Sequence, residues 1–202
     1  MKISILIEGD TERVFIPVVR SFLSVRLQGE MPRLDPVICD GRIPKEDKLR
    51  RMVVNLLSGR EASDAVIALT DVYTGTNDFI GADDAKKKML AWVENEPRFY
   101  PHVALHDFEA WLLPYWPEIQ KLAGSTRQSP GPHPETINRD NPPAHRIAEI
   151  FRTGTVGRKY VKPRDALRIL KNADLSVSAN ACPELKALLN TILQLCGETI
   201  LT

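Results

Sequence analysis

Strand-length apolar segments that alternate with amphipathic segments constrain the fold of this chain more than any other feature. Residues 2–8 (KISILIE) and 65–70 (AVIALT) are continuous apolar runs without the alternation of a half-exposed strand. Such runs are typical of parallel strands that are covered on both faces. A shorter apolar segment over 36–39 lies between them, and another follows Pro101 over 102–105. The sequence therefore predicts an α/β fold with a central, mainly parallel sheet of about four strands flanked by helices.

The segments after these strands have the apolar spacing of helices. Asp10 or Thr11 is expected to cap the first helix, with Pro17 bending the helix or shifting its start. The remaining helices of this half are predicted over 45–57, 85–94 and 108–116, the last ended by Pro117.

The C-terminal third has a different pattern. Residues 124–143 contain five prolines and no apolar period, which predicts a long loop or lid. Three helices are expected after it, over 144–151, 163–172 and 183–195, with breaks at Asp174 and Ser176–Asn180. We therefore expect an α/β core over 1–123, a proline-rich loop over 124–143, and a helical extension over 144–202 that packs on the core.

The amino-acid composition indicates where in the cell the protein acts, but it says little about what reaction the protein could catalyse. The 27 basic and 26 acidic residues give a net charge of +1, so only local patches can indicate a polyanionic partner. The three cysteines form no CxxC motif, and their odd number favours reduced thiols. No stretch of 18 apolar residues is present, and MKISILIEGD turns acidic where a signal peptide would continue. We expect a cytoplasmic protein without a membrane segment.

Acidic residues follow the first and third predicted strands. Glu8 ends the first strand and Asp71 follows the third, and the carboxyl ends of parallel strands meet at one edge of the sheet, where ligands bind. Carboxylates there can hold a divalent cation or move a proton. Glu12 can reach the same ion, or it can cap the first helix. Asp78 can complete a magnesium ligand set, or it can form a turn with Asn77.

The segment HDFEAWLL places three polar residues, His106, Asp107 and Glu109, at the end of the fourth strand. Acids in a first helical turn are common because they complement the helix dipole. Their position at a third strand end favours a role in the same site. Phe108, Trp111 and Leu112 are most simply core residues, although Trp111 and Trp116 can stack on a base.

A basic segment lies in the predicted helical extension. Residues 139–171 contain nine Lys or Arg and three acids, a local net charge of +6. Such a segment suits a phosphate backbone, and a solvated helix face produces similar counts. We select Arg146, Arg158, Lys159 and Lys162 as candidate nucleic-acid ligands. Lys162, in the predicted loop GRKYVKP, can also neutralise a phosphoryl oxygen.

Several signatures of other enzyme classes are missing. The sequence has no GxxxxGK[ST], GxGxxG, GxSxG or HExxH motif. This argues against hydrolysis of nucleoside triphosphates by a P-loop and against zinc chemistry.

Six motifs, in order along nearly the whole chain, resemble an uncharacterised toprim-like bacterial family, domain of unknown function 4276. That family is distantly similar to the toprim nuclease domain of overcoming-lysogenization-defect nucleases. The matching residues are Glu8 to Glu12, Asp71-Val72-Tyr73 with Asp78-Phe79, His106 to Ala110, Pro142 to Arg146, Tyr160-Val161-Lys162, and Cys182-Pro183. The resemblance implies a Rossmann-like toprim fold with the C-terminal helical extension.

The resemblance also implies Mg²⁺- or Mn²⁺-dependent phosphodiester chemistry. Glu8 and Lys162 would be catalytic, the metal ligands would be Glu8, Asp71, Asp78 and Glu109, and Glu12, Tyr73, His106 and Asp107 would support them. Three positions depart from the pattern. Tyr73 replaces the second aspartate of the toprim Asp-x-Asp motif, Asp107 stands where relatives more often have Glu, and His145 stands where they often have Lys.

Two readings follow from the sequence. The leading one is a nuclease or nuclease subunit acting on DNA or RNA, in a bacterial defence or processing system with an ATPase partner of the ABC or structural-maintenance class. The alternative is a non-catalytic toprim-like module that docks on an ATPase or on nucleic acid. Phosphoryl or nucleotidyl transfer on a small nucleotide would use the same ions. Homodimerisation is a further open expectation.

Overall fold

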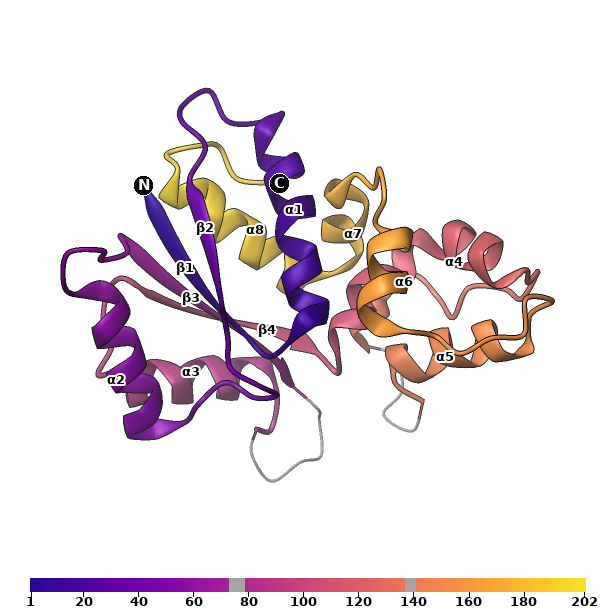
Figure 1. Ribbon diagram of the computed structural model, residues 1–202, viewed down its shortest axis with the longest axis horizontal. Coiled ribbons are helices and arrows are strands. Elements are labelled where there is room, and N and C mark those ends of the chain that lie inside the picture. Colours follow the sequence, from indigo (N-terminus) through magenta and orange to yellow (C-terminus); the bar gives the residue numbers. More distant parts are fainter. Residues whose placement is uncertain (73–78, 137–140) are drawn as a thin grey trace.

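Four parallel strands form one sheet in the computed structural model, which describes residues 1–72, 79–136 and 141–202 (Figure 1). The sheet has the order β2-β1-β3-β4. The chain leaves the central strand β1 for β2 on one side and returns to β3 on the other. This arrangement creates a switch point between β1 and β3, where open α/β sheets bind ligands. The strands are β1 (Lys2–Ile7), β2 (Arg33–Ile38), β3 (Ala65–Val72) and β4 (Phe99–Leu105).

Helices cover both faces of the sheet, as the apolar strand sequences predict. Ile5 and Ile67 belong to a core that includes α1 (Asp10–Ser24), whereas Leu6 and Val66 face a second core. The second core is closed by α2 (Glu46–Leu57) and α3 (Ala82–Trp92). Figure 1 shows α2 and α3 on one side of the sheet and α1 and α8 on the other. The predicted α/β fold is confirmed.

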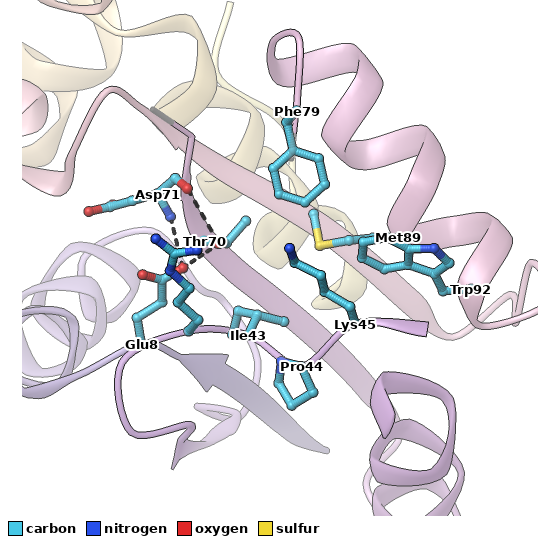
Figure 2. Close-up of a pocket in the computed structure, with 10 residues that line it drawn as sticks. Glu8, Ile43, Pro44, Lys45, Thr70, Asp71, Phe79, Met89 and Trp92 are labelled. Carbon is cyan, nitrogen blue, oxygen red and sulfur yellow. Dashed lines mark hydrogen bonds between the residues drawn. The ribbon is translucent and has the colours of Figure 1, made fainter. Parts of the chain in front are cut away.

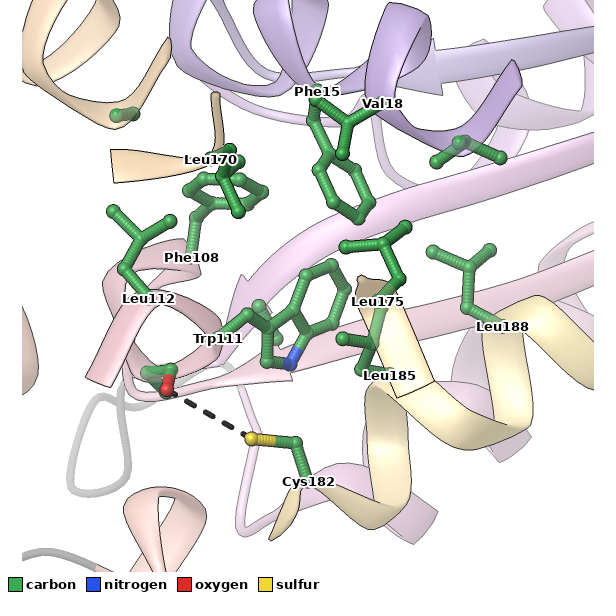
Figure 3. Packing of buried hydrophobic residues seen from close by; sticks show 14 of the residues in the cluster. Phe15, Val18, Phe108, Trp111, Leu112, Leu170, Leu175, Cys182, Leu185 and Leu188 are labelled. Atoms are coloured by element: carbon green, nitrogen blue, oxygen red, sulfur yellow. Dashed lines mark hydrogen bonds between the residues drawn. The ribbon is translucent and has the colours of Figure 1, made fainter. Parts of the chain in front are cut away.

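The helical extension shares the first core with α1. Three aromatic side chains lie at its centre, Phe15, Phe108 and Trp111, with ring centroids 5.3 to 5.8 Å apart (Figure 3). Leu175 and Leu185 of the extension pack against them. The extension thus completes the cover over one face of the sheet. Its helices are α5 (Pro143–Thr153), α6 (Lys162–Ile169), α7 (Leu175–Ala181) and α8 (Pro183–Leu195).

The predicted strand boundaries were too short at both edges of the sheet. β2 begins at Arg33 and contains Pro36, and β4 begins at Phe99 and contains Pro101. Proline cannot donate to a strand ladder, so it is tolerated on edge strands, where one side of the strand needs no partner. β2 and β4 are the two edge strands of the described sheet.

Two helix predictions were wrong. Pro117 does not end the helical structure, because residues 108–115 form a 3₁₀ helix, η1 (Phe108–Tyr115), and α4 (Trp116–Ala123) then begins with Pro117 in its first turn. Proline is tolerated there because the first backbone amides of a helix need no intrahelical partner. The break expected over Ser176–Asn180 is absent, because these residues lie within α7. Asp174 does lie between α6 and α7 as predicted, and it caps α7, since its side chain accepts a 3.0 Å hydrogen bond from the amide of Ser176.

The proline-rich segment is largely irregular where it is described, with one short 3₁₀ turn, η2 (Pro134–Thr136). It is attached to the core through Glu135, whose carboxylate accepts hydrogen bonds from Trp111 Nε1 at 3.0 Å and from the amide of Glu184 at 3.1 Å. Among the helices of the described ranges, none is both long and apolar enough to cross a bilayer.

Candidate active site

Glu8 lies at the switch point, one residue beyond the end of β1. One of its carboxylate oxygens, Oε1, accepts a hydrogen bond from the hydroxyl of Thr70 and a second, of 3.3 Å, from the amide of Asp71. Burial raises the pKa of Glu8, and these two hydrogen bonds partly oppose the increase. The C-terminal end of β3 therefore fixes the position of the Glu8 side chain.

Glu12 lies in the first turn of α1 and is buried. Its Oε2 accepts a 2.9 Å hydrogen bond from the amide of Gly9, which is the capping contact considered from the sequence. The charge of Glu12 also raises the pKa of Glu8, so the residue is close enough to influence the site. Glu12 therefore caps α1 and also lies beside the strand ends that form the site.

Asp71 is the electrostatic centre of the site. Burial is the largest cause that raises its pKa well above the ordinary value, and the charges of four other acids raise it further. Those four are Glu8, Glu12, Asp107 and Glu109. We call these five residues the acidic cluster. Their mutual repulsion shows that the structure gathers carboxylates from the ends of β1, β3 and β4 at one edge of the sheet.

An unusual turn brings the acids after β4 into the cluster. His106 has a φ of +70°, a left-handed conformation that side chains other than glycine rarely adopt. Its amide donates a 3.0 Å hydrogen bond to the carbonyl of Val72, which holds the turn against the end of β3. The chain then enters η1 with Asp107 and Glu109 almost completely buried. His106 is thus placed as a turn residue beside the cluster.

Asp107 connects the cluster to the end of the proline-rich segment. Its Oδ2 accepts a 3.1 Å hydrogen bond from the amide of Ala144 in α5, while its buried Oδ1 has no hydrogen-bond partner among the described residues. Burial and the neighbouring charge of Glu109 raise the pKa of Asp107 to about 7. A buried carboxylate oxygen without a donor is suited to accept a cation or a proton.

Lys162 supplies a positive charge to the cluster from the helical extension. The sequence placed it in a loop, which was wrong, because it is the first residue of α6. Its Nζ lies 3.2 Å from Oε2 of Glu109, and the Tyr160 hydroxyl donates a 3.4 Å hydrogen bond to Oε1 of the same carboxylate. Partial burial lowers the pKa of Lys162, but the charges of Glu109 and Asp107 outweigh it and raise the pKa overall.

Another buried acid, Asp165, binds residues on both sides of Lys162 and so fixes the position of this segment. The guanidinium of Arg158 binds both of its oxygens, at 2.7 and 3.0 Å, and the amide of Val161 donates a 2.8 Å hydrogen bond. Arg158 also lies over the ring of Phe151, with 4.5 Å between its guanidinium carbon and the ring centroid. Arg158, which we selected for nucleic-acid binding, therefore makes contacts that stabilise the helical extension.

The other basic candidates differ in their surroundings. Lys159 is exposed, and the Nε of Arg146 donates a 2.8 Å hydrogen bond to the carbonyl of Asn141. Nucleic-acid binding by Arg146, Arg158, Lys159 and Lys162 stays a prediction.

Two basic residues that the sequence interpretation missed, Arg42 and Lys45, line a pocket beside Glu8 and Asp71 (Figure 2). They follow a turn in which Asp40 and Gly41 have φ angles of +47° and +109°. The amide of Gly41 donates a 2.8 Å hydrogen bond to the carbonyl of Glu8, so the turn is fixed to the end of β1. The sequence signal for this part of the site was the Asp40-Gly41 pair, which begins two residues after the end of β2 and turns the chain at the sheet edge where ligands bind.

Oxygen donors of the kind that magnesium prefers are present, but they are not pre-assembled. Within the described ranges, no group of three His, Cys, Asp or Glu side chains has the spacing to hold a metal ion. Magnesium is commonly held by one or two carboxylates together with waters and substrate oxygens. Glu8 and Asp71 fit that requirement in donor type and position. Tyr73 and Asp78, which the sequence also selected, lie outside the described residues.

Comparison with known proteins identifies the family of the chain and solved structures that share its fold. The family model described as Domain of unknown function (DUF4276) matches residues 7–193. The C-terminal region of the Burkholderia pseudomallei OLD protein superposes with a TM-score of 0.53 at 16% identity, covering 96% of this chain and 98% of that one. The C-terminal region of the Xanthomonas campestris pv. campestris OLD protein gives 0.50 at 15% identity, with coverages of 97% and 93%. No curated protein sequence gives a significant match. The predicted toprim-like fold is confirmed.

Proposed function

The chain belongs to the DUF4276 family, and we propose that it is a magnesium-dependent phosphodiester-cleaving protein or the nuclease subunit of a larger assembly. The observation that carries the proposal is the acidic cluster, in which four carboxylates raise the pKa of Asp71 at the C-terminal edge of a parallel sheet. Without a counter-cation, such a concentration of negative charge destabilises a folded protein. Strongly perturbed carboxylates at a switch point are typical of functional sites.

Glu8 and Asp71 would hold the metal ion, with Glu109 and, outside the described residues, Asp78 as further ligands. Mn²⁺ would suit the same oxygen donors. When bound, the ion lowers the pKa of a water molecule and neutralises charge on the phosphoryl group. The donor types fit this role, and the orphaned Oδ1 of Asp107 offers a further oxygen next to the cluster.

Side chains of the protein would supply proton transfer and stabilise the charge of the transition state. Glu8, fixed by Thr70 and by the amide of Asp71, would take a proton from the attacking water, and its raised pKa suits a proton acceptor. Lys162 would exchange part of its contact with Glu109 for a phosphate oxygen and stabilise the negative charge of the transition state.

The partners would be a nucleic acid and an ATPase. The solved structures that share this fold are C-terminal regions of longer OLD proteins. By analogy, we propose that this chain acts with an ATPase of the ABC or structural-maintenance class in bacterial defence or nucleic-acid processing. Free cysteines at positions 39, 182 and 196 suit action in the reducing cytoplasm. A homodimer is compatible with this proposal.

The alternative function is a toprim-like module that binds an ATPase or nucleic acid without catalysis. It is favoured by Tyr73, which replaces the second aspartate of the toprim Asp-x-Asp motif. A metal site with one charged ligand fewer would bind magnesium more weakly.

A metal-dependent cleavage assay separates these functions. Single-stranded and duplex DNA, single-stranded RNA and transfer RNA are incubated with Mg²⁺ or Mn²⁺, with and without any ATPase that a neighbouring gene encodes. We expect cleavage that Glu8→Gln and Asp71→Asn abolish and that Asp83→Asn, an exposed acid in the first turn of α3, leaves unchanged. If no substrate is cleaved with any metal or partner, the proposed nuclease function is wrong.

A further inference from the structure

The pocket between the ends of β1 and β3 has walls of opposite character. Glu8, Thr70 and Asp71 form a polar wall that belongs to the proposed catalytic site. Five other residues form an apolar wall: Ile43, Pro44, Phe79, Met89 and Trp92. Figure 2 shows the two walls facing the same space, with Lys45 extending toward it from the loop before α2.

Aromatic rings dominate the apolar wall. The rings of Phe79 and Trp92 lie 6.1 Å apart between centroids and are tilted by 44°. Both side chains are half-buried, so part of each ring faces solvent at the pocket. Exposed aromatic faces beside a cationic group are the combination that single-stranded nucleic acids use for binding, since every base has a face that can stack.

Positive charge reaches the pocket from the side opposite Lys162. Arg42 and Lys45 flank Ile43, which packs in the core under α2 and α3. Lys162 begins α6, which packs against α1 and η1 in the core on the other face of the sheet. The acidic cluster therefore lies between two cationic groups. A polyanion that crosses the sheet edge meets a cation before and after the carboxylates, which by themselves would repel it.

We propose that this pocket is a nucleotide subsite for one unpaired nucleotide next to the scissile phosphate. Arg42 and Lys45 bind the phosphate of this nucleotide, and Phe79 and Trp92 contact its base. The proposal rests on the proposed function, because it takes the acidic cluster as the position of the scissile phosphate. A base in a duplex is covered on both faces by its neighbours, so contact with the aromatic wall requires a single strand or an extruded base.

Trp92 provides a direct measurement of occupancy. The other tryptophans, Trp111 and Trp116, are buried and hydrogen-bonded, to Glu135 and to the carbonyl of Arg127. Fluorescence of the full chain is titrated in EDTA, which prevents metal-dependent cleavage, with a single-stranded oligonucleotide, the matching duplex, a nucleoside 5′-monophosphate and inorganic phosphate. We expect saturable quenching by the single strand, weaker quenching by the mononucleotide, and none by duplex or phosphate. Trp92→Phe should abolish the quenching while affinity, followed by anisotropy of a labelled strand, is largely retained.

The phosphate contact is tested by salt dependence. For single strands the slope of log affinity against log salt changes by about 0.7 for each phosphate that is neutralised, so Arg42→Ala/Lys45→Ala, which removes both ligands of one phosphate, should reduce it by about 0.7. Lys48→Ala/Arg51→Ala removes the same charge from exposed positions on the first turns of α2 and should leave the slope unchanged. Trp92→Ala should weaken binding on the order of tenfold.

Three results would overturn the subsite: no binding of the single strand, an unchanged slope in the Arg42/Lys45 variant, or equal quenching by duplex and single strand. These results are independent of cleavage. A wild-type protein that cleaves nothing but binds as described refutes the proposed catalysis and retains the subsite. Cleavage that is insensitive to Arg42→Ala/Lys45→Ala retains the catalysis and refutes the subsite.

Discussion

Lys162 Nζ lies 3.2 Å from Oε2 of Glu109, which joins the exposed start of α6 to a carboxylate with no solvent exposure. Burial raises the pKa of Glu109, and Lys162 is the largest influence that opposes the increase. Lys162 thus favours the ionised form of a buried acid near Asp71. The ion pair also places the lysine where a phosphoryl group would approach the acidic cluster.

Replacement of Lys162 should separate its structural and catalytic contributions. Lys162→Ala leaves Glu109 without its cation, so we expect the free energy of unfolding at pH 8 to fall by about 1 to 2 kcal/mol, less than for a fully buried pair because the lysine is half exposed. In a cleavage assay kcat should fall more than KM rises. Lys121→Ala, at an exposed position of α4, is the control and should change neither quantity. An equal effect of both variants would contradict a specific role for Lys162.

Magnesium should stabilise the protein more at pH 8 than at pH 5. The pKa values of Glu8 and Asp71 are raised in the folded state, so their contribution favours folding below the ordinary carboxyl pKa and is lost as pH rises through the folded pKa. A bound divalent cation neutralises the ionised carboxylates and so prevents this loss of stability at high pH. The measurement is the thermal midpoint at each pH, with and without Mg²⁺.

Asp71→Asn is the matched variant for this experiment. It should raise the midpoint of the metal-free protein at pH 8, because one repelling charge is removed, and it should abolish most of the Mg²⁺-dependent increase. A metal-dependent shift of the same size in Asp71→Asn would place the ion elsewhere.

Asp165 should stabilise the extension in a pH-dependent manner. Burial alone would raise its pKa, but hydrogen bonds from Arg158, Arg164 and the amide of Val161 outweigh it and lower the pKa from 3.8 to about 2. That shift corresponds to about 2 kcal/mol of stability, present above pH 4 and lost as the pH falls toward 2. Asp165→Asn should therefore lower the free energy of unfolding by about 2 kcal/mol at pH 7. Urea unfolding measures this free energy, and the exposed Asp83→Asn is the control. If the two variants do not differ, the arginine contacts of Asp165 contribute little.

The sequence predicted the sheet because β1 and β3 are continuous apolar runs that only a covered strand can use. It also selected Glu8, Asp71 and Glu109, since acids at strand ends stand out against apolar neighbours. Edge strands were harder, because Pro36 and Pro101 interrupt their patterns. Local patterns are least informative where tertiary contacts decide the conformation.

Helix α7 and the pocket illustrate that limit. Residues 175–181 contain two serines and an asparagine, and the cap formed by Asp174 together with burial of Leu175 makes the segment helical. Arg42 lies outside every predicted element and Lys45 is only the first residue of the helix predicted over 45–57, so no pattern marks either as a site residue. They become part of the pocket because the Gly41 amide is bound to the carbonyl of Glu8, a contact between distant parts of the sequence.

Asp78 and Tyr73 decide between an enzyme and a binding module, although both lie outside the described residues. If Asp78 replaces the missing second aspartate, Asp78→Asn should abolish metal-dependent cleavage as thoroughly as Asp71→Asn, because a hard divalent cation loses a charged ligand in both variants. Cleavage rates for the two variants at saturating Mg²⁺, beside wild type and Asp83→Asn, test this equivalence.

Tyr73→Asp gives the converse test, because it restores the second acid of the toprim motif. In an active wild-type protein with Asp78 as a ligand, the added carboxylate should change cleavage little, since the ion already has its charged donors. In an inactive wild-type protein, a large gain of cleavage would show that the native chain had lost a ligand, and binding would be its native function. If Tyr73→Asp is inactive and Glu8→Gln leaves the biological phenotype intact, the acidic cluster has no catalytic role.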